Sequence, residues 1–380
     1  MGIHSRYGRL VVSSFLLAAA ATSANAQSTL ALELMPRAPQ STGVQLYGLV
    51  DSALGYVSNE GGHASWSMIG GGGDRPNRWG IRGLEDLGDG NHALFVLEGG
   101  FNVGTGTISQ NGALFGRQAY VGLSNDRFGT LTLGHQYDFM VDLVGYSAPA
   151  SGNGGQFSFH LGDLDRLGGE RLNNAVKYRS PVYEGFQVGA MYSFGGVAGN
   201  FNENSASSFG ISYAPTSTVS MGAAYTTVHN YQQALGIGTT VLGLSLAGFP
   251  PNAIYDRQTV FGAGVSYSPG KLYTAALFTL TSLELAGKSA VFRTADVGAS
   301  YQILPRLVLG SALTYSWLGD VHWTNFTGGL QYFLSRRTDV YLQYAALHAS
   351  GPDVNAQLFL ALPASGSSQT AVSVGMRHVF

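Results

Sequence analysis

The chain has 380 residues, of which 45% are hydrophobic, only 11% are charged and 54 are glycine, with a formal net charge of −2 and no cysteine. Soluble chains carry about 25% charged residues and about 7% glycine, and this composition excludes disorder and a general attraction to nucleic acid. After residue 26, no run approaches the ~18 consecutive apolar residues of a membrane-spanning helix, so we expect the apolar residues to lie in strands.

The first 26 residues have the parts of a secretory signal peptide. Arg6 and Arg9 precede an apolar run at residues 10–21, and Ala24-Asn25-Ala26 supplies a small-residue cleavage site. We therefore expect export and a mature chain that starts at Gln27. Residues 27–42 form an N-terminal extension of unknown role, and the remaining domain spans residues 43–380.

Alternating segments of about ten residues fill this domain. Leu46, Val50 and Leu54 share one face of the first segment and Asp51 lies on the other, and the last segment, residues 372–380, alternates in the same way. Turn-forming residues separate the segments, and we count seven short turns and eight long loops, which predicts about sixteen antiparallel strands. The expected long loops are 58–76, 104–113, 138–172, 196–204, 230–256, 283–292, 319–323 and 349–368.

So many antiparallel strands can be arranged in two ways. A soluble sandwich buries its apolar face, whereas a membrane barrel turns the apolar face to lipid and the polar face to a lumen. Alternation alone does not distinguish them. Export, low charge, alternating short and long connections, and aromatic residues near strand ends such as Tyr213, Tyr267 and Trp317 favour an all-β transmembrane barrel.

At this point the sequence resembles a known family, the trimeric general porins of the Gram-negative outer membrane, especially the beta-proteobacterial and neisserial type. The matching pieces occur in order and cover most of the mature chain: residues 46–56, 77–88 (NRWGIRGLEDLG), 114–123 (LFGRQAYVGL), 128–138 (FGTLTLGHQYD), 173–181 (NNAVKYRSP) and 372–380.

The resemblance implies a sixteen-stranded barrel, a homotrimer in outer-membrane lipid, and a third extracellular loop, residues 138–172, folded into the lumen as a constriction. It also implies that Phe380 is the signal by which the barrel-assembly machinery recognises the C-terminal strand. The chain departs from the family in the extension at 27–42 and at His135, where relatives often have arginine. A histidine would make that position of the wall a weaker, pH-dependent charge.

The charged residues predict a basic side and an acidic side of the constriction. Because a charge facing lipid at the membrane midplane costs about 2 to 4 kcal/mol, strand residues of this kind are expected to face the lumen. His135 is less settled, because the register of Leu131 and Leu133 turns it outward unless the strand ends or bulges. Asp51 either lines the lumen or braces Arg82. The expected basic wall is Arg78, Arg82, Arg117, His135, Lys177 and Arg179, and the expected acidic loop residues facing it are Asp138, Asp142, Asp163 and Asp165.

Passive diffusion of small hydrophilic solutes and ions is the expected function, with a slight preference for anions. The alternative is a solute-selective channel for a sugar or an organic anion. The sequence has no Gly-x-Ser-x-Gly elbow and no metal-ligand spacing among its histidines, so we expect neither catalysis nor a metal or cofactor. The faint calcium-loop pattern that starts at Asp163 has Leu167 where an oxygen ligand belongs.

Overall fold

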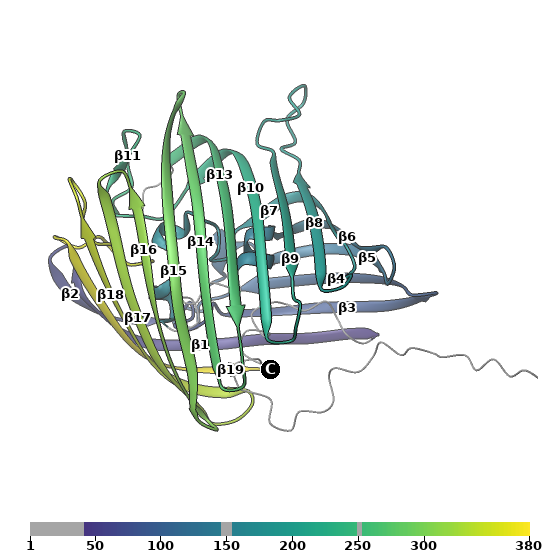
Figure 1. Cartoon of the computed structure of the whole chain (residues 1–380), viewed down its shortest axis with the longest axis horizontal. Coiled ribbons are helices and arrows are strands. Elements are labelled where there is room, and N and C mark those ends of the chain that lie inside the picture. Colours follow the sequence, from purple (N-terminus) through teal and green to yellow (C-terminus); the bar gives the residue numbers. More distant parts are fainter. Residues whose placement is uncertain (1–41, 146–153, 249–252) are drawn as a thin grey trace, which may run out of the picture.

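The computed structural model describes residues 42–145, 154–248 and 253–380 (Figure 1). The expected signal peptide and, apart from Thr42, the N-terminal extension lie outside the described residues, so both stay predictions. The strands are β1 (Gly43–Glu60), β2 (His63–Ile69), β3 (Arg78–Gly88), β4 (Asn91–Gly100), β5 (Gln118–Asn125), β6 (Gly129–Tyr137), β7 (Arg171–Arg179), β8 (Phe186–Ser193), β9 (Ala206–Tyr213), β10 (Val219–Gln233), β11 (Thr240–Val241), β12 (Leu244–Ser245), β13 (Ala253–Tyr267), β14 (Leu272–Leu285), β15 (Lys288–Leu304), β16 (Leu307–Leu318), β17 (Val321–Phe333), β18 (Thr338–Ser350) and β19 (Ser368–Val379).

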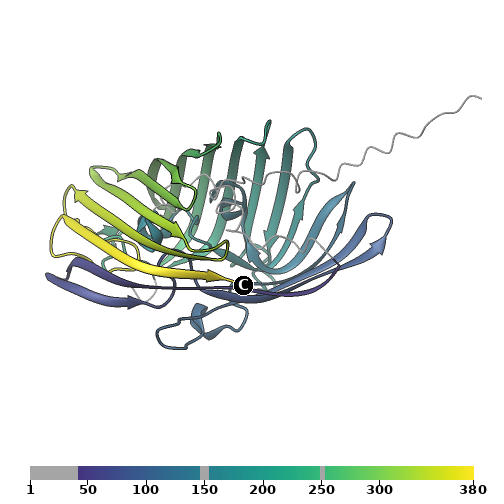
Figure 2. The ribbon, with the colours of Figure 1, turned by 90° about the horizontal axis from the view of Figure 1, so that it is seen from below.

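Helical structure in these ranges is limited to short pieces. They are α2 (Ser109–Gly112), η1 (Met140–Val144), η3 (Gly155–Ser158) and η4 (Leu161–Asp163). None of the described helices has the length and apolarity needed to cross a membrane. The β4–β5 connection, residues 101–117, carries α2 and stands away from the wall of strands (Figure 2).

All of these strands except β11 and β12, which pair with each other, form one closed antiparallel sheet. β19 pairs with β1 from Leu49↔Val379 to Val57↔Ala371, which joins the last strand to the first. β2 pairs with residues 53–60 of β1 and β3 pairs with residues 43–49, so β2 and β3 are two parts of one wall strand. The 17 strands of the sheet therefore make a barrel of 16, which confirms the predicted fold. Closure pairs every strand edge, as a span in lipid requires.

The two faces of the wall differ in polarity as the alternation predicts. On β18, Leu342 and Tyr344 are 45% and 41% exposed on the outside, whereas Gln343 between them points inward and is 4% exposed. Val374 lies outward and Ser373 inward on β19 in the same pattern. The outward face is apolar because it meets lipid, and the inward face is polar because it meets the aqueous lumen.

Several expected long loops are shorter in the structure because the strands continue into them. The expected loop at 283–292 is a hairpin in which only Ala286 and Gly287 separate β14 from β15, both with positive φ (50° and 75°). This backbone suits a two-residue turn between twisted strands. Likewise, Gly61 and Gly62 join β1 to β2, and Gly319 and Asp320 join β16 to β17.

Two segments of the chain leave the wall and enter the barrel. The first is the inward loop, residues 138–170, of which 138–145 and 154–170 are described; it carries η1, η3 and η4. The second is the glycine segment, residues 70–77, which interrupts the wall strand between β2 and β3. The two segments touch, because the N–H of Gln156 donates a hydrogen bond of 2.9 Å to the carbonyl of Gly73.

At the end of the barrel that carries the long loops, three connections are joined to one another by hydrogen bonds. Residues 351–367 bind residues 234–248 through Asn355 N–H to the carbonyl of Gly238 (2.9 Å), and the β1–β2 hairpin through Gly61 N–H to the carbonyl of Pro363 (2.9 Å). Their apolar side chains form one buried cluster with Phe157 of the inward loop. These connections, together with the strands of the wall, therefore hold the inward loop in place.

Candidate pore constriction

Glycines in the wall seat the first part of the inward loop. Phe139 packs on Gly189 of β8, and the Cε of Met140 lies 2.6 Å from where a Cβ would stand on Gly262 of β13. Both loop side chains are fully buried. Because these wall positions have no side chain, the loop backbone lies close against β8, β9, β10 and β13 on the inner face.

Asp138 is held at the start of the loop by a partner from the end of the same loop. Its Oδ2 accepts a hydrogen bond of 2.5 Å from Nε of Arg166, and Nη1 of Arg166 donates to Oε1 of Gln258 on β13 at 3.2 Å. Burial raises the pKa of Asp138, an effect that the charge of Arg166 opposes. The loop is therefore closed on itself and bound to the wall by one buried cation.

Asp142 is the one predicted loop acid, among the described residues, that meets the predicted basic wall. Its Oδ2 forms ion pairs with both Lys177 and Arg179 of β7. Lys177 is buried, whereas the Arg179 side chain is 33% exposed. The loop thus lies directly against this part of the wall, and two cations share one carboxylate there.

Asp165 and His160 fix the far part of the loop to β14 and β15. His160 Nδ1 lies 2.6 Å from Oδ2 of Asp165, and Nε2 lies 3.0 Å from Oδ2 of Asp296. Asp165 also accepts a hydrogen bond of 2.9 Å from Thr279. Burial alone would lower the pKa of His160, but the two carboxylates raise it well above its usual value. The imidazole therefore donates to both acids as a cation.

Asp163 has a structural partner within the loop. Its Oδ1 accepts a hydrogen bond of 2.6 Å from the N–H of Gly168, and burial, followed by the charges of Glu170 and Asp165, raises its pKa well above the usual range. The expected acidic side of the constriction is thus different in the structure. Asp138, Asp163 and Asp165 are bound within the loop or to β13–β15, and only Asp142 contacts the basic wall.

The remaining strand arginines line the inner face of β3 and the entrance to β5. Arg117 Nε donates to Oε1 of Glu98 at 2.6 Å, and its Nη2 donates to the hydroxyl of Tyr137 at 2.8 Å. Arg78 donates to the carbonyl of Pro76 at 3.2 Å. Arg82 donates to Oε1 of Gln45 at 3.1 Å and lies 5.0 Å over the ring of Tyr47.

His135 does not join this wall. It pairs with Ala119 of β5 while Leu133 pairs with Val121, which is 57% exposed, so His135 follows the outward face. The register shift between β6 and β7, where Gly134 pairs with Ala175 and Gln136 with Leu172, places the extra residue in β7 and leaves the alternation of β6 unbroken. The inward placement of His135 is corrected on this basis. Its ring nitrogens lie near Asn173 Oδ1 (2.6 Å) and the carbonyl of Gly116 (3.1 Å).

Asp51 points inward, but it braces the glycine segment and not Arg82. Its carboxylate accepts the N–H groups of Gly73, Asp74 and Arg75 at 2.9 to 3.1 Å and the hydroxyl of Tyr341 at 2.5 Å. Successive backbone N–H groups form a cradle for an anion, and the Asp51 carboxylate fills it. The segment is held in the lumen by a side chain of the wall.

Charged residues absent from the predicted set complete the interior. Arg377 of β19 pairs with Asp74 of the glycine segment (3.0 Å) and with Asp339 of β18 (2.9 Å). Arg171 donates to the hydroxyl of Tyr137 at 3.0 Å and lies 4.8 Å over its ring. The inward position of Arg377 was predictable, because it shares the polar face of the last strand. Its pairing with Asp74 was not predictable, because Asp74 lies some 300 positions earlier in the chain.

The fold and these contacts define a class of protein. A closed barrel with a lipid-facing exterior and a polar interior, narrowed by an inward loop and lined by charges, is a β-barrel channel of an outer membrane. Comparison with known proteins agrees. The chain matches the family described as Gram-negative porin over residues 13–352. The chain belongs to this family.

The similar proteins are outer-membrane porins over nearly their full length. An outer membrane porin protein of Bordetella pertussis is 30% identical and covers 90% of this chain and 96% of its own length. Outer membrane porin protein 32 of Delftia acidovorans is 28% identical, covering 89% and 94%. The solved anion-selective porin from Comamonas acidovorans has a TM-score of 0.72 and 25% identity, covering 90% of this chain and 100% of its own. This chain is therefore an outer-membrane porin, a passive diffusion channel for small hydrophilic solutes and ions.

Proposed function

We propose that the channel prefers anions and that solutes pass the side of the inward loop that faces Arg78, Arg82, Arg117, Lys177 and Arg179. The carrying observation is the cluster at Asp142, where one carboxylate serves both Lys177 and Arg179. The Arg179 side chain is 33% exposed at this cluster. A partly exposed excess cation beside a narrow aqueous path lowers the energy of a passing anion and raises that of a cation.

Neutral partners of other arginines support the same preference. Arg78 donates to a backbone carbonyl, and Arg171 donates to a phenol and to the carbonyl of Arg117. Hydrogen bonds of this kind add no negative charge, and the carboxylate beside Arg78, that of Glu98, is shared with Arg117. By contrast, the acids Asp74 and Asp339 are both paired with cations, Asp74 with Arg75 and Arg377 and Asp339 with Arg377. A related porin from Comamonas acidovorans is described as anion-selective, which agrees with this balance.

Single-channel recording in asymmetric salt tests the proposal. Arg179→Gln should lower the anion-to-cation permeability ratio roughly fivefold, because a unit charge about 8 Å from the path in water is worth about 0.5 kcal/mol for each ion, with opposite signs for anion and cation. Arg336→Gln, an exposed charge in the turn between β17 and β18, is the matched control and should leave the reversal potential unchanged. If both variants and the parent have the same reversal potential, Arg179 does not lie at the constriction.

A solute-selective channel for organic anions is the second candidate, favoured by two arginines stacked on tyrosines. Arg82 lies over Tyr47 and Arg171 over Tyr137, at 5.0 and 4.8 Å. Such pairs offer a cation beside an apolar ring, which suits a carboxylate with an organic body. Saturable block of the ion current by an organic anion would favour this function, while liposome swelling that falls smoothly with solute size would favour general diffusion.

Assembly as a homotrimer, through a C-terminal signal read by the barrel-assembly machinery, is part of the same proposal. Phe380 exchanges two backbone hydrogen bonds of 3.0 Å with Gly48, and its ring occupies the space beside Gly48 that a Cβ would need. The terminal residue therefore takes part in barrel closure. Phe380→Ala should lower the amount of barrel in the outer membrane, and cross-linking of the purified protein to a trimer tests the oligomeric state.

A further inference from the structure

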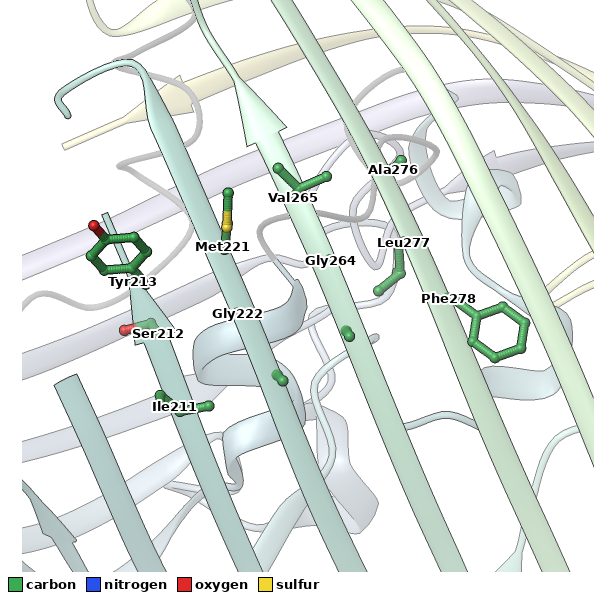
Figure 3. Close-up of a pocket in the computed structure, with 12 residues that line it drawn as sticks. Ile211, Ser212, Tyr213, Met221, Gly222, Gly264, Val265, Ala276, Leu277 and Phe278 are labelled. Carbon is green, nitrogen blue, oxygen red and sulfur yellow. The ribbon is translucent and has the colours of Figure 1, made fainter. Parts of the chain in front are cut away.

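A groove of about 560 Å³ lies on the outward, lipid-facing side of β9, β10, β13 and β14 (Figure 3). One row of paired residues across these strands explains its shape. Ile211 pairs with Ala223, Ala223 with Ala263, and Ala263 with Phe278. The small side chains of Ala223 and Ala263 thus lie between two large ones, and these two alanines form the floor of the groove.

The groove is closed at one end and open at the other. Two residues further along each strand, toward the middle of the wall, the outward row is Phe209, Tyr225, Phe261 and Leu280, all of them large. In the opposite direction the row is Tyr213, Met221, Val265 and Ala276. Its one small side chain, Ala276, lies on β14, so the groove continues toward the short turns along this strand. Short turns of outer-membrane barrels lie on the periplasmic side, so the open end faces the periplasmic interface.

Positive charge lies at that interface. The two short turns that join the strands of the groove, β9 to β10 and β13 to β14, contain Lys271 and no acidic residue. Leu280 lies nine residues from Lys271 along β14. At about 3.3 Å per residue and a tilt of about 40°, this separation spans about 22 Å of the membrane normal. One leaflet with its headgroup layer has about the same thickness.

We propose that this groove binds a phospholipid of the periplasmic leaflet. Its acyl chain lies over Ala223 and Ala263 between Ile211 and Phe278, and its phosphate lies beside Lys271. A second barrel is a poorer occupant, because the convex wall of one cylinder does not fill a groove in another. The apolar lining suits a hydrocarbon chain, and the ammonium of Lys271 complements the phosphate charge.

Native mass spectrometry of the full-length barrel, extracted in mild detergent and incubated with phosphatidylethanolamine and phosphatidylglycerol, tests the proposal. The parent protein should retain phospholipid. Ala263→Leu fills the floor and should lower retention about tenfold, since it displaces about two methylene groups of contact. Ala346→Leu, an outward alanine on β18 paired with Phe326, is the matched control and should retain lipid like the parent. Lys271→Gln should lower retention of both lipids.

A second measurement does not depend on the folding of the alanine variants. A photoreactive benzophenone side chain at position 278, irradiated after bulk lipid is removed, should cross-link to phospholipid, whereas the same side chain at outward position 326 should not. Equal retention in Ala263→Leu and Ala346→Leu, or equal cross-linking at both positions, would overturn the groove site. Cross-linking at position 278 to lipopolysaccharide or to a second copy of the chain would replace the phospholipid by that occupant.

Discussion

Gly189 provides the space that the ring of Phe139 occupies, because a Cβ at this glycine would overlap the ring atoms. The contact joins the wall strand β8 to the first residue after Asp138 in the inward loop. A similar relation holds between Gly262 and Met140, where the loop side chain lies over bare backbone. The position of the constriction therefore depends on missing side chains in the wall as much as on charges.

Gly189→Ala should displace Phe139 and loosen the inward loop. An added carbon in a packed site costs about 1–3 kcal/mol, so we expect a lower unfolding temperature and more open-channel current noise. Gly328→Ala is the control, because the nearest atom to a Cβ there is 3.7 Å away. A Gly189→Ala channel with parental stability and noise would show that the loop is held elsewhere.

Asp142→Asn should strengthen the anion preference. The substitution removes the one negative charge shared by Lys177 and Arg179, and at about 8 Å in water a unit charge changes ion permeation roughly twofold. It also leaves the buried Lys177 without its charged partner, so stability should fall. Reversal potentials in asymmetric salt measure the first effect. Asp89→Asn in the β3–β4 turn is the control, and a shift toward cations in Asp142→Asn would contradict the proposed charge balance.

Alternation made the wall predictable from sequence, since period two assigns Leu342 outward and Gln343 inward without any knowledge of neighbours. The same rule placed Arg78, Arg117 and Lys177 inward. It also turned His135 outward with Leu133, and the structure follows the register and not the family pattern. Local pattern is sufficient where the only question is which face a side chain takes.

Pairing inside the lumen was less predictable because it depends on the path of two inward segments. Asp51 meets the N–H groups of a glycine-rich segment that sequence reading assigns to an ordinary loop. His160 meets Asp296, which lies 136 positions later on β15. Contacts of this kind follow from tertiary geometry, and they cannot be predicted from the composition or spacing of one stretch of sequence.

Asp51→Asn should destabilise the barrel by loosening the glycine segment. The carboxylate accepts three backbone N–H groups and the Tyr341 hydroxyl, and an amide offers only one accepting oxygen. Each buried donor left without an acceptor costs about 1–3 kcal/mol. Thermal unfolding followed by circular dichroism measures the loss, with Asp126→Asn in the exposed β5–β6 turn as the control. A midpoint equal to that of the control would mean that the segment is held by its other contacts, those of Arg377 with Asp74 and of Gln156 with Gly73.

His160 should make the stability of the barrel fall at alkaline pH. Its pKa in the folded chain is raised well above the usual value, because Asp165 and Asp296 face both ring nitrogens. A raised pKa gives stability that is complete below the unfolded value of about 6.5 and is lost as pH rises through the folded pKa. The two acids are the groups in direct contact with the ring, and Thr279, which donates to Asp165, carries no charge, so the sign is not reversed.

Melting temperatures of the parent and of His160→Gln, measured from pH 6 to pH 10, isolate this contribution. Glutamine does not titrate, so the difference between the two proteins should be largest near pH 6 and should shrink as pH rises, while background titrations cancel. His63→Gln, at the exposed start of β2, should run parallel to the parent at every pH. A parent–variant difference that stays constant across the range would show that His160 holds the inward loop through neutral hydrogen bonds alone.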